Sequence, residues 1–164
     1  MTRPHTRHAL HSHLLAIAAA ACAAGMAPPA SAQTEGGLYI AGYGFSFQEV
    51  ADRAIAQNPG RQRFFLLSLP PQTQALATSA AGPLAAARDR VVATNGVLLV
   101  CQRDIDNRNI DAASLAPQVV AVRGWPPAGS PSLPPGERYF KGENPAHLPA
   151  SNEALRRLRS TCSD

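Results

Sequence analysis

The sequence is poor in the side chains that bind metals or act as nucleophiles. Its 164 residues include three cysteines and five histidines, and aromatic residues make up only 5%. Cys22 and four of the histidines fall within the first 32 residues, which leaves Cys101, Cys162 and His147. Because a zinc site needs about four ligands, we expect neither a metal nor another cofactor. His147 stands among prolines, in a predicted loop, which argues against a histidine-based catalytic triad.

No apolar run is long enough for a membrane-spanning helix. The alanine-rich stretch over residues 14–24 follows Arg3 and Arg7 and precedes the small residues Ala30-Ser31-Ala32. This order is typical of a secretory signal peptide. The sequence therefore predicts a signal peptide over residues 1–32, cleavage between Ala32 and Gln33, and a periplasmic or secreted protein with no membrane insertion after cleavage. Cys22 lacks the leucine expected upstream in a lipoprotein signal.

Charge is sparse as well, since charged residues make up 16% of the chain and the formal net charge is +4. Removing residues 1–32 removes two arginines and no acids, which leaves 13 basic and 11 acidic residues, a net charge of +2. This balance gives no reason to expect a nucleic-acid partner. The remaining 132 residues (164 minus 32) suffice for one domain with a hydrophobic core.

Apolar segments alternate with helix-forming segments along the rest of the chain. Strands are predicted at residues 38–44, 63–69, 97–101 and 119–122, and helices at 47–57, 72–94 with an interruption at Gly82-Pro83, and 152–160. Continuous apolar strands between helices indicate a parallel sheet. We therefore expect a small three-layer α/β sandwich with a mostly parallel sheet, followed by a Pro-rich C-terminal extension. The expected domain covers residues 33–125, and the extension with its last helix covers 126–164.

A specific core follows from this pattern. Phe65, Leu67, Leu99 and Val120 are expected in central strands, covered by Val50, Ile55 and Val91 from helices. Ser46 and Glu49 form a predicted capping box at the start of the first helix, and Asn95-Gly96 is typical of a helix end.

Cys101 is the principal candidate for chemistry. It ends the apolar run Gly96-Val97-Leu98-Leu99-Val100, and a polar loop follows at once. Ligands bind at the carboxyl ends of strands in open α/β sheets, and nearby arginines favour the reactive thiolate. Arg103 and Arg108 are candidates to stabilise that thiolate or to bind an anionic substrate, and Gln102 and Asn109 complete the candidate set. A buried cysteine with only a packing role is the competing interpretation.

The order of segments from Phe64 to Trp125 resembles the DsrE/DsrF-like sulfur-relay family. The resemblance lies in a strand, the segment 69–76, a helix, Asn95-Gly96-Val97-Leu98-Leu99-Val100-Cys101, a polar loop with Arg108-Asn109-Ile110-Asp111, and the strand 119–122 before Gly124. It covers about 60 residues. It implies a compact α/β fold, homo-oligomers, a sulfur-donor or sulfur-acceptor protein as partner, and a sulfur-carrying cysteine, which by position is Cys101.

Other interpretations stay open. Rhodaneses and cysteine phosphatases place five residues between the cysteine and an arginine, but six separate Cys101 from Arg108. Cys162 is either the disulfide partner of Cys101 or a resolving thiol. The alternative to a sulfur-carrier or thiol-redox, sulfurtransferase-like protein is a non-catalytic periplasmic binding or scaffold module with a structural cysteine. Trp125, Tyr139 and Phe140 would then either anchor a partner or pin the extension to the core.

The predicted signal peptide can be tested by N-terminal sequencing of the exported protein. Cleavage after Ala30-Ser31-Ala32 should give a first residue at or next to Gln33, because small residues occupy the positions that the cleaving peptidase recognises. An exported protein that keeps residues 14–24, or that carries a lipid on Cys22, would contradict the prediction.

Overall fold

Four short strands form one sheet, and all of its neighbouring strands are parallel. The computed structural model describes residues 36–123 and 143–163. The strands are β1 (Leu38–Ala41), β2 (Phe64–Ser68), β3 (Gly96–Cys101) and β4 (Val119–Val122), and their order in the sheet is the order of the chain. The expected α/β sandwich with a parallel sheet is thus confirmed. β2 and β3 occupy the centre, and β1 and β4 form the edges.

Helix α1 (Phe47–Gln57) begins at the predicted capping box. Ser46 Oγ accepts a hydrogen bond from Glu49 N, and the Glu49 carboxylate accepts one from Ser46 N at 2.9 Å. The Ser46 hydroxyl also donates to the Glu49 carboxylate at 2.6 Å, and this hydrogen bond, followed by the one from the Ser46 backbone, lowers the pKa of Glu49. The reciprocal bonds use N–H groups that the first helical turn would otherwise leave unpaired.

Helix α2 (Gly82–Ala93) begins where the sequence suggested an interruption. Proline lacks an N–H and is well suited to the first turn of a helix, so Gly82-Pro83 opens α2, and residues 72–76 form a separate 3₁₀ helix. The predicted turn after α2 is confirmed, because Asn95 has a left-handed φ of 71°. At Gly96 a Cβ atom would lie 2.5 Å from Val91 Cγ1, so this close approach of helix and strand requires glycine.

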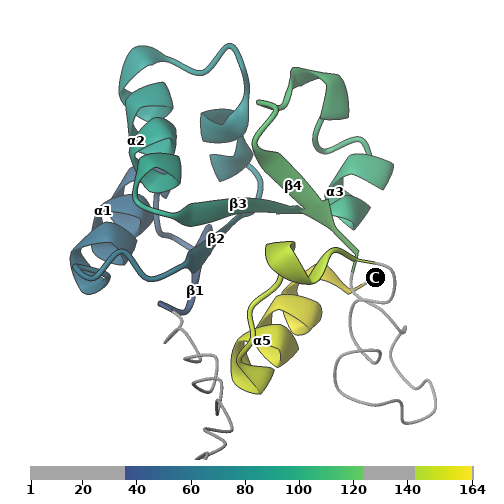
Figure 1. Ribbon diagram of the computed structural model, residues 1–164. Coiled ribbons are helices and arrows are strands. Elements are labelled where there is room, and N and C mark those ends of the chain that lie inside the picture. Colours follow the sequence, from purple (N-terminus) through teal and green to yellow (C-terminus); the bar gives the residue numbers. More distant parts are fainter. Residues whose placement is uncertain (1–35, 124–142, 164) are drawn as a thin grey trace, which may run out of the picture. The chain divides into compact units, whose positions relative to one another are not determined.

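One face of the sheet is covered by α1 and α2. Parallel strands in sequential order with right-handed crossovers place their connecting helices on the same side of a sheet, and Figure 1 shows both helices there. The cluster on this face is formed by buried residues of strands and helices, among them Phe64, Leu66, Leu98 and Val100 from the sheet and Phe47, Val50, Ala54 and Val91 from the helices.

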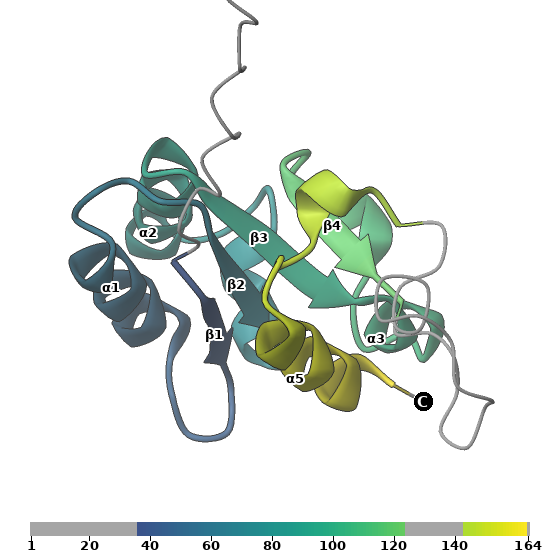
Figure 2. The same ribbon diagram turned by 60° about the horizontal axis from the view of Figure 1, so that its bottom comes forward.

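The opposite face is covered by α5 (Asn152–Cys162), as Figures 1 and 2 show. Its cluster contains Leu38, Phe65, Leu67, Leu99, Cys101 and Val122 from the strands and Ala154, Leu155, Leu158 and Cys162 from the helix. Parallel sheets need cover on both faces because their strands are apolar on both. A helix that the sequence places in a C-terminal extension therefore forms one layer of the sandwich.

This arrangement corrects two expectations about the core. Phe65, Leu67 and Leu99 do lie in central strands, but they face α5, whereas Val50 and Val91 pack on the other face. Side chains alternate between the two faces of a sheet along a strand, and a continuous apolar run does not show which residues lie on which face. For this reason the covering helices were assigned to the wrong face. The prediction for Val120 was also wrong, since β4 is an edge strand and Val120 is only half-buried.

The polar segment after β3 is partly helical rather than a loop. Residues Gln102–Asp106 form the short helix α3, and 3₁₀ helices follow at Ala112–Ser114 and Pro145–His147. The predicted signal peptide and cleavage site, and most of the Pro-rich segment with Trp125, Tyr139 and Phe140, lie outside the described residues.

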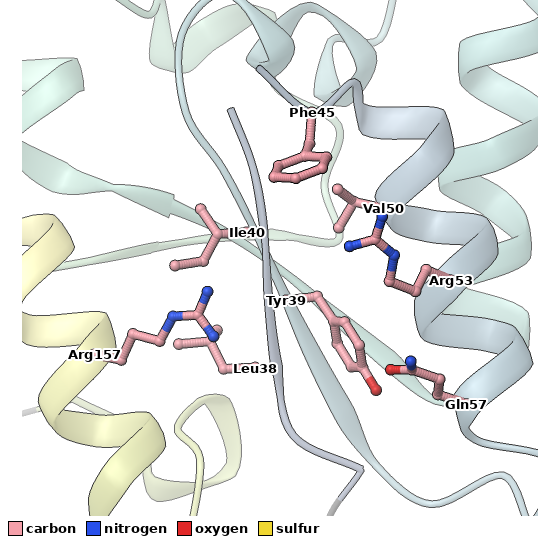
Figure 3. A pocket seen from close by; sticks show the side chains of 8 residues that line it. All are labelled: Leu38, Tyr39, Ile40, Phe45, Val50, Arg53, Gln57 and Arg157. Atoms are coloured by element: carbon pink, nitrogen blue, oxygen red, sulfur yellow. The ribbon is translucent and has the colours of Figure 1, made fainter. Parts of the chain in front are cut away.

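A groove of about 330 Å³ runs along the outer edge of β1. Figure 3 shows α1 on one side of this strand and α5 on the other. The groove is lined by Leu38, Tyr39, Ile40, Phe45, Val50, Arg53, Gln57 and Arg157. We call it the β1 groove.

Replacing Leu99 by alanine tests the assignment of β3 to the centre of the sheet. Leu99 is fully buried beneath α5, so Leu99→Ala should lower the free energy of unfolding by about 2–5 kcal/mol through lost burial and a residual cavity. Urea denaturation measures the change. The matched control is Val92→Ala on α2, where the side chain is 40% exposed, and its effect should stay within about 0.5 kcal/mol. Equal effects of the two changes would contradict the assignment.

Candidate functional site

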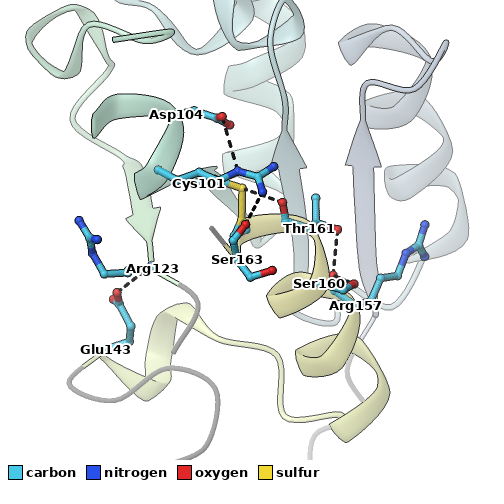
Figure 4. The surroundings of a disulfide bond; sticks show 10 residues. Cys101, Asp104, Arg123, Glu143, Arg157, Ser160, Thr161 and Ser163 are labelled. Atoms are coloured by element: carbon cyan, nitrogen blue, oxygen red, sulfur yellow. Dashed lines mark hydrogen bonds and ion pairs between the residues drawn. A yellow bond between two sulfur atoms is a disulfide. The ribbon is translucent and has the colours of Figure 1, made fainter. Parts of the chain in front are cut away.

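Cys101, the principal candidate for chemistry, is joined to Cys162 by a disulfide bond. Cys101 is the last residue of β3 and Cys162 the last of α5, with 5.0 Å between their Cα atoms and a sequence separation of 61. Their exposed fractions are 0% and 2%. Figure 4 shows the bond linking the end of α5 to the end of the central strand. The sequence left two roles open for Cys162, disulfide partner of Cys101 or resolving thiol. In the structure it is the disulfide partner.

The sulfur atoms lie in the apolar layer between the sheet and α5. Both cysteines belong to the same buried cluster as Leu99, Val122 and Leu158. Cys101 Sγ also lies 3.8 Å from the carbonyl oxygen of Thr161, one residue before its partner. In the oxidised state Cys101 has no thiolate, and its sulfur is shielded from solvent.

Arg103 contacts the end of α5. Its Nη1 donates a hydrogen bond to the carbonyl oxygen of Ser163, the residue at the C-cap of α5, and its Nε lies 3.7 Å from Asp104 Oδ1. A cation at this position complements the partial negative charge at a helix C-terminus. Arg103 was predicted to stabilise a thiolate at Cys101, and in the structure its guanidinium binds the backbone at the end of the helix that supplies Cys162.

Gln102 belongs to a small exposed network on α3. Its Nε2 donates to Asp106 Oδ1 at 2.9 Å, and Arg123 forms an ion pair with the other oxygen of Asp106. These hydrogen bonds, first from Gln102 and then from Arg123, lower the pKa of Asp106. The network links α3 to the end of β4. Gln102 therefore has a hydrogen-bond partner on its own helix.

The other two candidates, Arg108 and Asn109, lie in the turn after α3. Arg108 is exposed, has a left-handed φ of 59°, and lines a hollow of about 420 Å³ with Ile105, Ile110 and Asp111. The N–H of Asn109 donates to the carbonyl oxygen of Asp104 at 2.8 Å. Their contacts belong to the turn and to this hollow, whereas those of Cys101 and Arg103 belong to α5.

Two further polar groups lie in this region. The carboxylate of Asp104 is buried, and its Oδ2 has no hydrogen-bond partner among the described residues. Ser163 was missed because a contact between its carbonyl and Arg103 spans 60 positions of the chain.

Within residues 36–123 and 143–163, no group of three or more His, Cys, Asp or Glu side chains is placed to hold a metal ion. Over the same residues no helix has the length and apolar character needed to cross a membrane. No protein-family model, no curated protein and no solved structure matches the chain.

Removal of the disulfide should destabilise the protein strongly. A cross-link that closes a loop of this length stabilises a fold by about 4 kcal/mol in the chain-entropy model, and here it also fixes the helix that covers one face of the sheet. Cys162→Ala should therefore lower the free energy of unfolding in urea by about 2–5 kcal/mol. Ser160→Ala, an exposed position on the same helix, is the control and should change it by less than about 0.5 kcal/mol. Equal effects would show that the bond contributes nothing to stability.

Proposed function

We propose that the protein is a non-catalytic, exported binding module in which Cys101 has a structural role. The observation that supports this best is the disulfide between Cys101 and Cys162. It occupies the one thiol that the sequence singled out for chemistry, and it does so with a residue of the helix that covers the second face of the sheet. Export agrees with the proposal, since disulfides persist in oxidising compartments.

The surroundings of the bond support a structural role in a second way. A reactive cysteine is exposed and lies beside cations that stabilise its thiolate. Cys101 is fully buried, and the guanidinium of Arg103 is engaged by the carbonyl of Ser163. Each of these groups holds α5 in place. Cys101 and Arg103, which suggested sulfur chemistry in the sequence, thus both make contacts that hold α5 against the sheet.

The competing proposal, a sulfur carrier with a persulfide on Cys101, makes different demands. Sulfur transfer would require the bond to Cys162 to be broken first, since only a free thiolate accepts sulfur from a persulfide donor. It would also require Cys101 to react much faster than Cys162. A structural disulfide makes no such distinction, because both sulfur atoms are buried in the same apolar layer.

This difference in reactivity provides the test. The variants Cys162→Ser and Cys101→Ser each leave one thiol, at Cys101 and at Cys162 respectively, once residues 1–32 have been removed. Incubation with glutathione persulfide adds one sulfur atom, about 32 Da, to a reactive thiol, and mass spectrometry follows its rate. For a structural role we expect the two rates to agree within about threefold and the oxidised wild type to take up no sulfur.

The result that overturns the proposal is equally specific. Sulfur addition at Cys101 at least about tenfold faster than at Cys162 would indicate an activated thiolate. Persulfide found on Cys101 in the unreduced native protein would do the same. Unfolding in urea, measured in parallel, shows whether both variants are still folded, and the rates are compared only under conditions in which they are.

A further inference from the structure

The outer edge of β1 has unpaired backbone groups. Among the strands of the described residues, β1 pairs with β2 alone, on one side. The carbonyl of Gly37 accepts a hydrogen bond from Phe65 N, and the carbonyl of Ala41 accepts one from Leu69 N. Since hydrogen bonds of a parallel strand alternate from residue to residue, the N–H and C=O groups of Leu38 and Ile40 point away from the sheet. They are the donors and acceptors that an added strand would use.

The β1 groove provides apolar contacts beside these groups. Leu38 and Ile40 project on the side of α5, while Tyr39 projects on the side of α1 (Figure 3). Two aromatic side chains are strongly exposed at the end of the strand, Tyr43 at 76% and Phe45 at 48%. Phe45 lines the groove. Exposed aromatic side chains at the rim of a groove are typical of binding surfaces.

The groove also has one sign of charge. Arg53 from α1 and Arg157 from α5 stand on opposite sides of β1, and its lining includes no carboxylate. Within the described part of the chain neither guanidinium is within ion-pair distance of an acid, and Arg53 lies 5.1 Å from the centre of the Phe45 ring. Glu49, one turn before Arg53 on α1, is held by Ser46 in the capping box and also attracts Arg53 electrostatically, while Glu153 contacts Arg156 at 3.6 Å with both side chains exposed.

This charge argues against β1 as a contact between two copies of the chain. A two-fold axis pairing β1 with β1 would bring each Arg53 to the α1 side of the other copy, and each Arg157 to the other α5 side. Like charges would then face each other on both sides of the sheet, which destabilises a pairing of strands. An acidic strand in the same position would meet a cation on each side.

We propose that the β1 groove binds an extended acidic segment of a partner protein, which adds to the sheet as a fifth strand beside β1. This inference rests on the proposed function as a binding module and specifies its ligand. Neighbouring residues of a strand point to opposite faces, so two adjacent acids in the segment suffice to reach Arg53 and Arg157. Apolar residues on either side contact Ile40 and Phe45.

A synthetic peptide tests the proposal directly. The probe is the fluorescein-labelled segment Val-Thr-Val-Glu-Glu-Val-Thr-Val, and its control carries Lys-Lys in place of Glu-Glu. Fluorescence anisotropy with the purified exported protein should show saturable binding of the acidic peptide. The basic peptide should bind at least about tenfold more weakly, and raising the salt concentration from about 0.05 M to about 0.5 M should weaken binding of the acidic peptide.

Neighbouring residues of α5 supply a matched pair of variants. Arg157→Glu should weaken binding of the acidic peptide at least about tenfold. Arg156→Glu makes the same change of charge one residue away, outside the groove lining, and should change the affinity less than about twofold. Equal effects of the two variants, or equal affinity for the acidic and basic peptides, would overturn the proposal.

The role of the strand edge needs a separate variant. Ile40→Pro removes an outward N–H but none of the bonds between β1 and β2, and proline is tolerated at such edge positions. It should reduce peptide binding at least about tenfold, whereas Ile40→Val should retain it. Should Ile40→Pro not fold, the comparison of Arg157→Glu with Arg156→Glu decides alone.

Two outcomes would assign the groove differently, and both overturn the proposal. Light scattering that shows a dimer dissociated by Ile40→Pro would make the edge a contact between copies. Saturable binding that is unaffected by Arg157→Glu and Ile40→Pro would place the peptide elsewhere. Neither result bears on the proposed structural role of Cys101, because the sulfur-transfer rates of the two cysteine variants test that role independently.

Discussion

The fold depends on covering the second face of a parallel sheet. Strands in sequential order receive their connecting helices on one side, and here α1 and α2 occupy it. The other side carries an equally apolar set of side chains, which would be exposed to water without a further element. α5 supplies that cover, and the bond between Cys101 and Cys162 fixes its last residue to the central strand β3. Arg103 holds the following residue, Ser163, by a hydrogen bond.

This constraint also explains the residues around Cys101. A cysteine at the carboxyl end of a strand and an arginine two residues later form a pattern shared by catalytic and structural sites. What distinguishes a catalytic from a structural site is the group that the cysteine and the arginine contact. In a catalytic site it would be a ligand or a substrate, whereas here it is the end of α5. Once the helix is in place, the cysteine and the cation both have partners within the chain itself, and the ligand site that we propose lies on another part of the surface, at the edge of β1.

The elements could largely be predicted from local signals in the sequence. The Ser46 capping box, the turn at Asn95 and the apolar strands β2 and β3 each depend on neighbouring residues, and the structure has all of them. The face on which each strand side chain packs could not be predicted, because a continuous apolar run places apolar side chains on both faces of the sheet. For the same reason the packing of Leu99 beneath α5 was missed.

The candidate site was less predictable than the fold for a physical reason. Its decisive contacts join residues about 60 positions apart in sequence, such as Cys101 with Cys162 and Arg103 with Ser163. The sequence contains the two cysteines, but it has no signal that decides whether they form a disulfide or remain free thiols. The β1 groove was missed altogether, since Arg53 and Arg157 come from helices 104 positions apart (157 minus 53) and are brought together only by the sheet between them.

The position of α5 in the chain has a consequence for synthesis. A chain made from its N-terminus has all four strands and the helices of the first face before α5 exists. Until α5 has been synthesised, its layer is missing from one face of the sheet. The disulfide cannot form before Cys162 has reached an oxidising compartment. Completion of the sandwich is thereby tied to the synthesis of α5, and formation of its cross-link to an oxidising environment. A chain held back in a reducing compartment keeps both thiols and lacks the covalent link between α5 and β3.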